Sequence, residues 1–100
     1  MKTRQVTSEE LKKAVAEFMH RLYKRGLTTT SGGNISVKEH NIVAVTPSAS
    51  DKGKMQPEEV GLLDPEGNMI GHKFKPSIET GLHLAIYHAR EDVSAVIHAH

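Results

Sequence analysis

The sequence predicts an α+β fold with a mostly antiparallel sheet, and three observations support this. An amphipathic helix opens the chain, two β-hairpins follow it, and a second helix leads into a final apolar strand. This order of helix, two hairpins, helix and strand is typical of an α+β domain. At 100 residues the chain has room for one domain of modest size.

The first element is a helix that we expect from about Ser8 to Arg25. It begins with a capping box, in which the Thr7 hydroxyl is followed three residues later by the Glu10 carboxylate. Gly26 supplies the left-handed conformation that ends a helix. The apolar residues at helical spacing that form one stripe are Leu11, Val15, Phe18 and Leu22.

Two β-hairpins are expected next. Residues 35–38 and 42–46 are strand-like runs joined by a turn at 39–41. A single helical turn at 57–59 precedes the second, shorter hairpin, whose strands at 61–64 and 68–71 flank a Pro-Glu-Gly turn. Residues 73–77 are expected to be extended, because the residue before a proline disfavours helix.

The second helix is expected from about Glu79 to Arg90, and the last strand from Ala95 to His100. This strand is predicted to be buried, which is unusual at a chain end because termini normally fray at the surface. We therefore expect residues 1–100 to be the N-terminal portion of a single longer domain whose C-terminal remainder is absent from this sequence. The residues expected on the inner face of the second helix are Leu82, Ala85, Ile86 and Ala89.

Composition excludes several classes of protein. Hydrophobic residues make up 37% of the chain and charged residues 25%, as in ordinary globular proteins. The net charge is +1 with no basic stripe, so no nucleic-acid partner is expected. No apolar run approaches the roughly 20 residues of a membrane span, and no secretory signal is visible. The chain has no cysteine, which excludes a disulfide framework and fits a cytoplasmic location.

The two histidines at the end of the last strand form a candidate half-site for zinc. His98 and His100 are two positions apart, so in a strand they would point to the same face at a separation of about 7 Å. Zinc accepts imidazole nitrogen as a ligand, but two ligands are only half of a tetrahedral site. The alternative is that both histidines simply form hydrogen bonds to loops.

Three further clusters each have a functional and a structural interpretation. Gly33 and Asn34 lie in a glycine-rich loop that is suited to an anion, or the loop is an ordinary turn. Ser48 lies in a hydroxyl-rich strand exit, which is also typical of a turn that hydroxyl side chains stabilise. Ser77 is a candidate N-cap of the second helix, and Glu79 is either a functional carboxylate or a capping acid in the first turn.

Taken together, these motifs resemble the class II aldolase and adducin family over nearly the whole chain. The most specific stretches are Lys75-Pro76-Ser77-x-Glu79, His83-Leu84-Ala85-Ile86-Tyr87 and Val96-Ile97-His98-Ala99-His100. The resemblance implies a three-layer αβα fold with a mostly antiparallel central sheet. It also implies that His98 and His100 bind Zn²⁺ or another divalent metal, and that Glu79 is the catalytic acid/base and also contacts the metal when substrate is absent. The residues implied to bind the substrate phosphate are Gly33, Asn34, Ser48 and Ser77.

The activity implied is that of a metal-dependent aldehyde-lyase. Such an enzyme cleaves a fuculose-phosphate-like ketose phosphate reversibly to dihydroxyacetone phosphate and an aldehyde. The alternatives within the family are a sugar-phosphate 4-epimerase, a dehydratase, a decarboxylase or a non-catalytic adducin-like interaction module. The family also implies a homo-oligomer, a tetramer, with a third histidine ligand and site tyrosines beyond residue 100.

Two departures from the family pattern concern the phosphate pocket. Ser48-Ala49 stands where family aldolases often have Thr-Gly, and Ile78 replaces a second serine. Either the pocket is rearranged or the substrate differs from fuculose phosphate.

Overall fold

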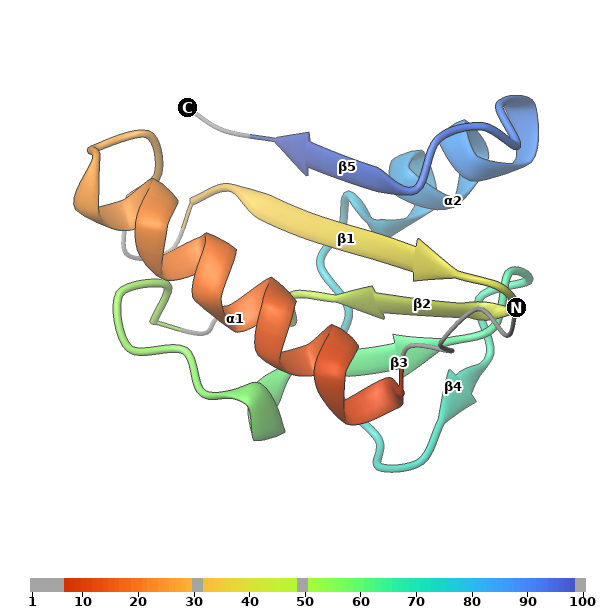
Figure 1. Ribbon diagram of the computed structural model, residues 1–100, viewed down its shortest axis with the longest axis horizontal. Helices are drawn as coiled ribbons and strands as arrows, with labels where there is room; N and C mark the ends of the chain where they lie inside the picture. The colour runs from red at the N-terminus through yellow and green to blue at the C-terminus, as the bar shows by residue number, and fades with distance from the viewer. Residues whose placement is uncertain (1–6, 30–31, 49–50, 99–100) are drawn as a thin grey trace, which may run out of the picture.

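The computed structural model describes residues 7–29, 32–48 and 51–98. It has the expected α+β fold, with a five-stranded sheet in the order β4-β3-β2-β1-β5 in which each neighbouring pair is antiparallel (Figure 1). Along the chain the elements are α1 (Ser8–Lys24), β1 (Asn34–Glu39), β2 (Ile42–Val45), η1 (Pro57–Glu59), β3 (Gly61–Leu63), β4 (Met69–Ile70), α2 (Thr80–Ala89) and β5 (Ala95–His98). Both predicted hairpins and the predicted turn at 57–59 are confirmed.

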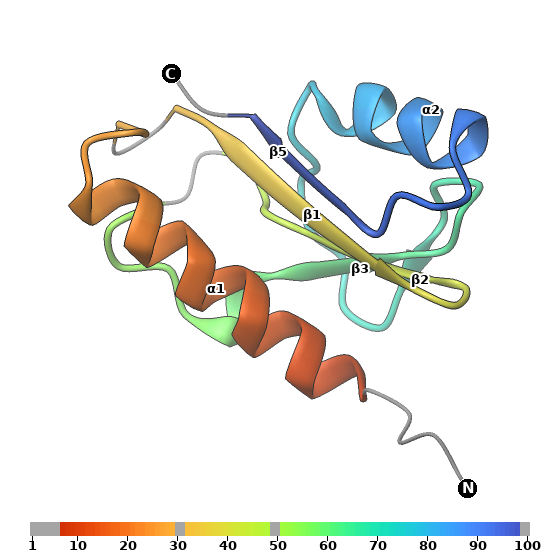
Figure 2. The ribbon, with the colours of Figure 1, turned by 45° about the horizontal axis from the view of Figure 1, so that its top comes forward.

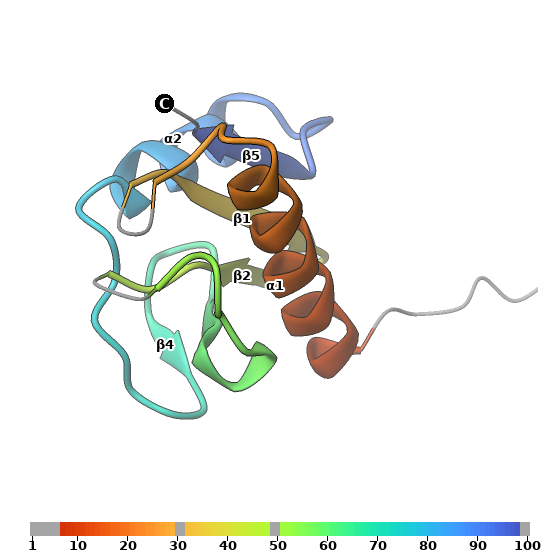
Figure 3. The ribbon, with the colours of Figure 1, turned by 90° about the vertical axis from the view of Figure 1, so that its left-hand side faces the viewer.

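The two helices cover opposite faces of the sheet, which confirms the three-layer αβα arrangement (Figure 2). Because side chains alternate along a strand, Ile35 and Ala44 pack against α1. Val43, Val45 and Leu63 face the other way and pack with Tyr87 of α2. The segment from β4 to α2 runs along the side of the sheet away from α1 (Figure 3).

Helix α1 begins as the sequence predicts, but its predicted apolar stripe is wrong at Phe18, which is 48% exposed, whereas Ala16 and Met19 are buried. The Thr7 hydroxyl accepts a hydrogen bond from the Glu10 backbone N–H at 3.1 Å, and the Glu10 carboxylate returns to the Thr7 backbone. This capping box satisfies N–H groups that would otherwise lack partners at the start of the helix. Among the described residues, no helix is both long and apolar enough to cross a bilayer.

The predicted inner face of α2 is wrong. Of the four predicted residues, Leu82, Ala85 and Ala89 are exposed and Ile86 is half-buried. The buried side chains of α2 belong instead to Thr80, His83 and Tyr87. Apolar spacing alone misassigned the face, because polar groups on the sheet give His83 and Tyr87 hydrogen-bond partners that make their burial favourable.

The prediction that the last strand is buried is also wrong for its described part. β5 is an edge strand paired only with β1, and Ile97 remains 54% exposed. The two faces of the strand differ: Val96 packs against the cluster that contains Tyr87, whereas the described residues leave Ile97 on the opposite face largely uncovered.

Candidate active site

Four segments meet at one edge of the sheet, which is the edge formed by the ends of the strands and not by the outer strand β5. β1 begins there, and β2 and β5 end there (Figure 1), and Glu79 at the start of α2 reaches the same edge through its contacts with Asn34 and His98. Because β1 is antiparallel to both neighbours, its first residue lies beside their last ones. Asn34 is paired directly with His98, so their side chains share the face that α2 covers.

Backbone hydrogen bonds join the loops around this edge. The Thr46 hydroxyl accepts from the Ile35 N–H at 3.2 Å, and the Thr46 N–H donates to the Ile35 carbonyl at 3.0 Å. The Ser48 N–H donates to the Lys75 carbonyl at 2.8 Å, and Pro47 forms a β-bridge with Pro76. The loop containing Ser48 is therefore held against the segment that leads to Ser77.

Gly33 enters β1 with a φ of +85°, a conformation that side chains other than glycine rarely adopt. A Cβ atom here would lie 2.6 Å from Thr28 Cγ2 and 3.1 Å from the His98 carbonyl oxygen. Glycine therefore lets the loop pass close to the end of β5.

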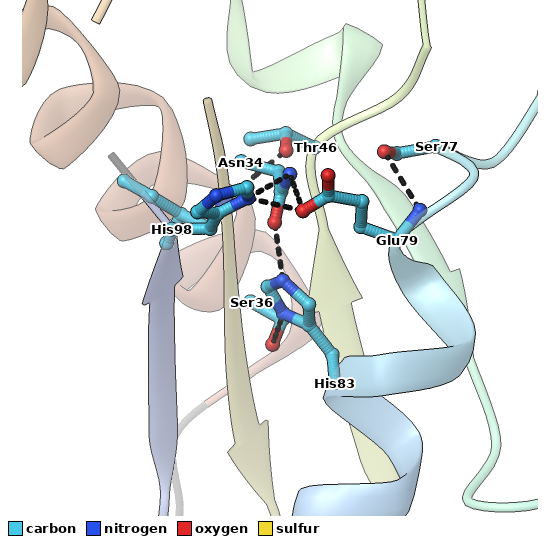
Figure 4. A network of polar contacts seen from close by, with 8 residues as sticks. Asn34, Ser36, Thr46, Ser77, Glu79, His83 and His98 are labelled. Carbon is cyan, nitrogen blue, oxygen red and sulfur yellow. Dashed lines mark hydrogen bonds and ion pairs between the residues drawn. The ribbon is translucent and has the colours of Figure 1, made fainter. Parts of the chain in front are cut away.

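Three polar side chains form the centre of the site (Figure 4). The Asn34 amide donates from Nδ2 to Glu79 Oε2 at 3.2 Å and lies 3.5 Å from His98 Nδ1. His98 Nδ1 also contacts Glu79 Oε2 directly. Asn34 is buried, whereas the His98 and Glu79 side chains are 38% and 32% exposed, so the pair is accessible from outside.

Glu79 lies at the start of α2, although its role there differs from the prediction. The N-cap position is occupied by Glu79 rather than by Ser77, and the Glu79 side chain makes no capping bond. The Ser77 hydroxyl instead accepts from the Glu79 backbone N–H at 3.2 Å. Ser77 thus fixes the backbone of Glu79 while its own O–H remains a possible donor.

Beneath this centre lies a buried polar group that the sequence did not single out as functional. Ser36 Oγ lies 2.6 Å from His83 Nδ1 and 2.7 Å from the Tyr87 hydroxyl, and His83 Nε2 contacts Asn34 Oδ1. Burial lowers the pKa of His83 below its ordinary value, while the Glu79 carboxylate opposes the shift. Burial likewise raises the pKa of Tyr87.

Lys52 is a second residue that sequence reasoning missed. Its side chain is buried, and Nζ donates to the Pro47 carbonyl at 3.3 Å. Burial lowers the pKa of Lys52, and the Glu59 carboxylate acts in the opposite direction. The lysine supports the loop that carries Ser48, and no local sequence motif indicates this.

The donors at the site suit a divalent metal ion only in part. His98 supplies an imidazole nitrogen and Glu79 a carboxylate oxygen, and both are ligand types for zinc. Over the described ranges, no third histidine, cysteine or acidic residue joins them in a cluster. His100, the other predicted ligand, lies outside the described residues.

The structure therefore brings Asn34, Glu79 and His98 into contact, and it places Ser77 against Glu79. Gly33 lies beside the His98 backbone, and Ser48 is tied to the strand-like segment that precedes Ser77. The predicted residues thus gather at one edge from positions up to 64 residues apart in the chain.

This fold is that of a known protein family. Residues 13–100 match the Class II Aldolase and Adducin N-terminal domain, and the chain belongs to that family.

Its relatives include enzymes with different reactions. L-fuculose phosphate aldolase of Methanocaldococcus jannaschii is 40% identical over 89 residues, which are 89% of this chain and 48% of that protein. 3-oxo-tetronate 4-phosphate decarboxylase of Haemophilus influenzae is 38% identical over 89% of this chain and 42% of its own length. A solved L-fuculose 1-phosphate aldolase matches 95% of this chain and 46% of its own, with 32% identity and a TM-score of 0.87. The chain thus spans about half the length of the relatives it matches.

Proposed function

We propose that the chain is the N-terminal portion of a class II aldolase domain that cleaves a ketose phosphate reversibly to dihydroxyacetone phosphate and an aldehyde. One observation carries the proposal: Glu79 and His98 meet beside Asn34 at an accessible edge of the sheet. Breaking a bond next to a carbonyl needs a group that transfers a proton and a group that polarises the carbonyl oxygen. A carboxylate can do the first, and a metal ion held by histidine can do the second.

In this proposal the loops around the edge hold the substrate phosphate. Asn34, which follows Gly33 in the chain, contacts the Glu79 carboxylate, and Ser77 contacts the Glu79 backbone N–H (Figure 4). Backbone N–H groups and hydroxyls are suitable phosphate donors. The Ser48 N–H already donates to Lys75, so Ser48 would contribute its hydroxyl. Binding energy at the phosphate would position the reacting carbons near Glu79.

A divalent metal ion, zinc or another, would be held by His98 and His100, by Glu79 while no substrate is bound, and by a further ligand from elsewhere in the protein. When bound, such an ion polarises the substrate's carbonyl and hydroxyl oxygens as a Lewis acid. The Glu79 carboxylate would move the proton, and the Asn34 amide would hold one carboxylate oxygen in place.

The decisive variant is Glu79→Gln in the full-length protein. It keeps the shape of the side chain but cannot carry the proton, so we expect turnover to fall at least about 100-fold while phosphate binding survives. Glu66→Gln, in the exposed turn between β3 and β4, is the matched control. Unchanged cleavage by the Glu79 variant would contradict the assignment.

A second reaction is favoured by one specific comparison, the decarboxylase relative at 38% identity. A dehydratase, a 4-epimerase and an adducin-like binding module are further alternatives to the aldolase.

Product analysis with ketose phosphates and with 3-oxo acid phosphates separates the reactions. Metal analysis separates enzyme from binding module, since a stoichiometric divalent ion favours the enzyme.

The assembly is also part of the proposal. We expect the whole protein to be a cytoplasmic homotetramer, by analogy with the family. Sedimentation of the full-length protein tests the tetramer, and a monomer would contradict it.

A further inference from the structure

A row of buried hydrogen-bonding groups runs from helix α2 and strand β1 into the candidate site. His83 is 1% exposed, Ser36 is 0% exposed and Tyr87 is 3% exposed. Burying a hydroxyl or an imidazole is unfavourable unless it is hydrogen-bonded. The proposed function uses none of these three residues, so their arrangement calls for a separate explanation.

The positions of the hydrogens along this row can be assigned by starting from the Glu79 carboxylate, where the row reaches the site. An ionised Glu79 carboxylate can only accept, so the Asn34 amide must present its NH₂ group to Oε2. The amide oxygen then faces His83 Nε2, which must carry a hydrogen in order to donate to it. In a neutral ring, the other nitrogen, Nδ1, is left as an acceptor.

The rest of the row agrees with this assignment. Ser36 must donate its hydroxyl hydrogen to His83 Nδ1, at 2.6 Å. Its oxygen then accepts from the Tyr87 hydroxyl at 2.7 Å. From Tyr87 to Glu79 every donor therefore points toward the site, and along this row no two hydrogens or lone pairs oppose each other.

We propose that His83 is a positioning residue that fixes the orientation of the Asn34 amide beside Glu79 and His98. A 180° turn of the amide would put its oxygen against the carboxylate and its NH₂ against the Nε2 hydrogen. The His83 ring therefore excludes the wrong orientation, as outer hydrogen bonds commonly orient groups that act at a site. The effect on turnover rests on the proposed function, whereas the tautomer and the amide orientation do not.

The first test measures the tautomer without any assay of activity. In the full-length protein labelled with ¹⁵N-histidine, the long-range ¹H–¹⁵N spectrum should show His83 with hydrogen on Nε2 and a lone pair on Nδ1. Tyr87→Phe, which removes only the far hydroxyl, should shift the Nδ1 resonance. A ring with hydrogen on Nδ1, or on both nitrogens, would overturn the proposal.

The second test compares three variants of His83. Gln places an amide N–H about where Nε2 lies, Asn places one near Nδ1, and Leu keeps the volume without a donor. We expect Gln to keep turnover and divalent-metal affinity within about 3-fold, and Asn and Leu to lose about 10–100-fold in one or both. The dissociation constant is measured by titration with Zn²⁺ alone, and the folded fraction by circular dichroism.

The outcomes separate the two proposals. If Leu fails to fold, Asn and Gln still give the comparison. If all three variants lose stability but keep Zn²⁺ affinity and turnover per folded molecule, His83 only packs the helix and the inference is wrong. If the wild type cleaves no ketose phosphate, the proposed reaction fails, while the tautomer and the Zn²⁺ titration still decide the role of His83.

Discussion

At the scale of single residues, Tyr87 links the stability of the fold to pH. Its hydroxyl is buried, and burial, the largest influence on it, raises its pKa above the ordinary value of 10.0. Below pH 10 the hydroxyl keeps its proton in the folded and the unfolded chain alike. Above pH 10 the unfolded chain loses the proton first, so the folded chain binds more protons and its stability falls as pH rises.

This sign gives a prediction for Tyr87→Phe in the full-length protein. Near pH 8 the variant should be less stable by about 1 kcal/mol, because it loses a buried hydrogen bond. Between pH 9 and 11 the difference in stability should shrink. The wild type loses stability there as the tyrosine of the unfolded chain ionises, whereas the variant has no such loss because phenylalanine cannot ionise. Urea unfolding across this range measures it, with Tyr23→Phe, the chain's other tyrosine, as the control. A constant difference from pH 8 to 11 would contradict the argument.

The sequence predicted the residues at the centre of the site but not those beneath it. Asn34, Glu79 and His98 belong to short motifs whose residue types already indicate chemistry. Ser36 and Tyr87 become meaningful only through the pairing of β1 with β5 and the rotation of α2. Those are long-range features, and no local spacing encodes them.

At the scale of elements, Gly33 controls how closely the loop before β1 approaches β5. We predict that Gly33→Ala destabilises the full-length protein by about 2–3 kcal/mol, from the positive φ and from the clash with Thr28 and the His98 carbonyl. Gly71→Ala is the matched control, because Gly71 also has a positive φ but has nothing within 4 Å of its added Cβ. It should cost about 1 kcal/mol.

A rescue makes the prediction specific. Thr28→Ser removes the Cγ2 atom that an added Cβ would meet at 2.6 Å, so the double variant should recover part of the loss. Thermal unfolding followed by circular dichroism compares the wild type with the three single variants and the double variant. Equal costs for the two alanine variants would show that the close approach is unimportant.

The local elements were predictable because their signals are local. The capping box, the hairpin turns and the proline at the start of η1 each act within a few residues. The buried face of α2 was not predictable in this way. That face depends on polar partners in β1, which override the apolar spacing of Leu82, Ala85 and Ala89.

At the scale of the whole molecule, the described chain buries two apolar clusters and leaves other apolar side chains outside them. One cluster lies between α1 and the sheet, and the other lies between the sheet and α2. Near the site, Ile78 is 98% exposed and Leu82 is 58% exposed. The relatives are about twice as long as this chain. In a protein of that length, further residues could pack on the outer side of α2.

This comparison predicts the effect of Leu82→Gln in the full-length protein. If further chain or another subunit packs on α2, the change should cost about 1–3 kcal/mol, because a buried leucine is lost. Leu27→Gln, the same change at a 45% exposed leucine in the loop after α1, should stay within about 0.5 kcal/mol. Urea unfolding measures both variants, and hydrogen exchange of the α2 amides reports whether protection falls there first. A Leu82 variant as stable as the wild type would mean that this side of α2 faces solvent in the whole protein as well.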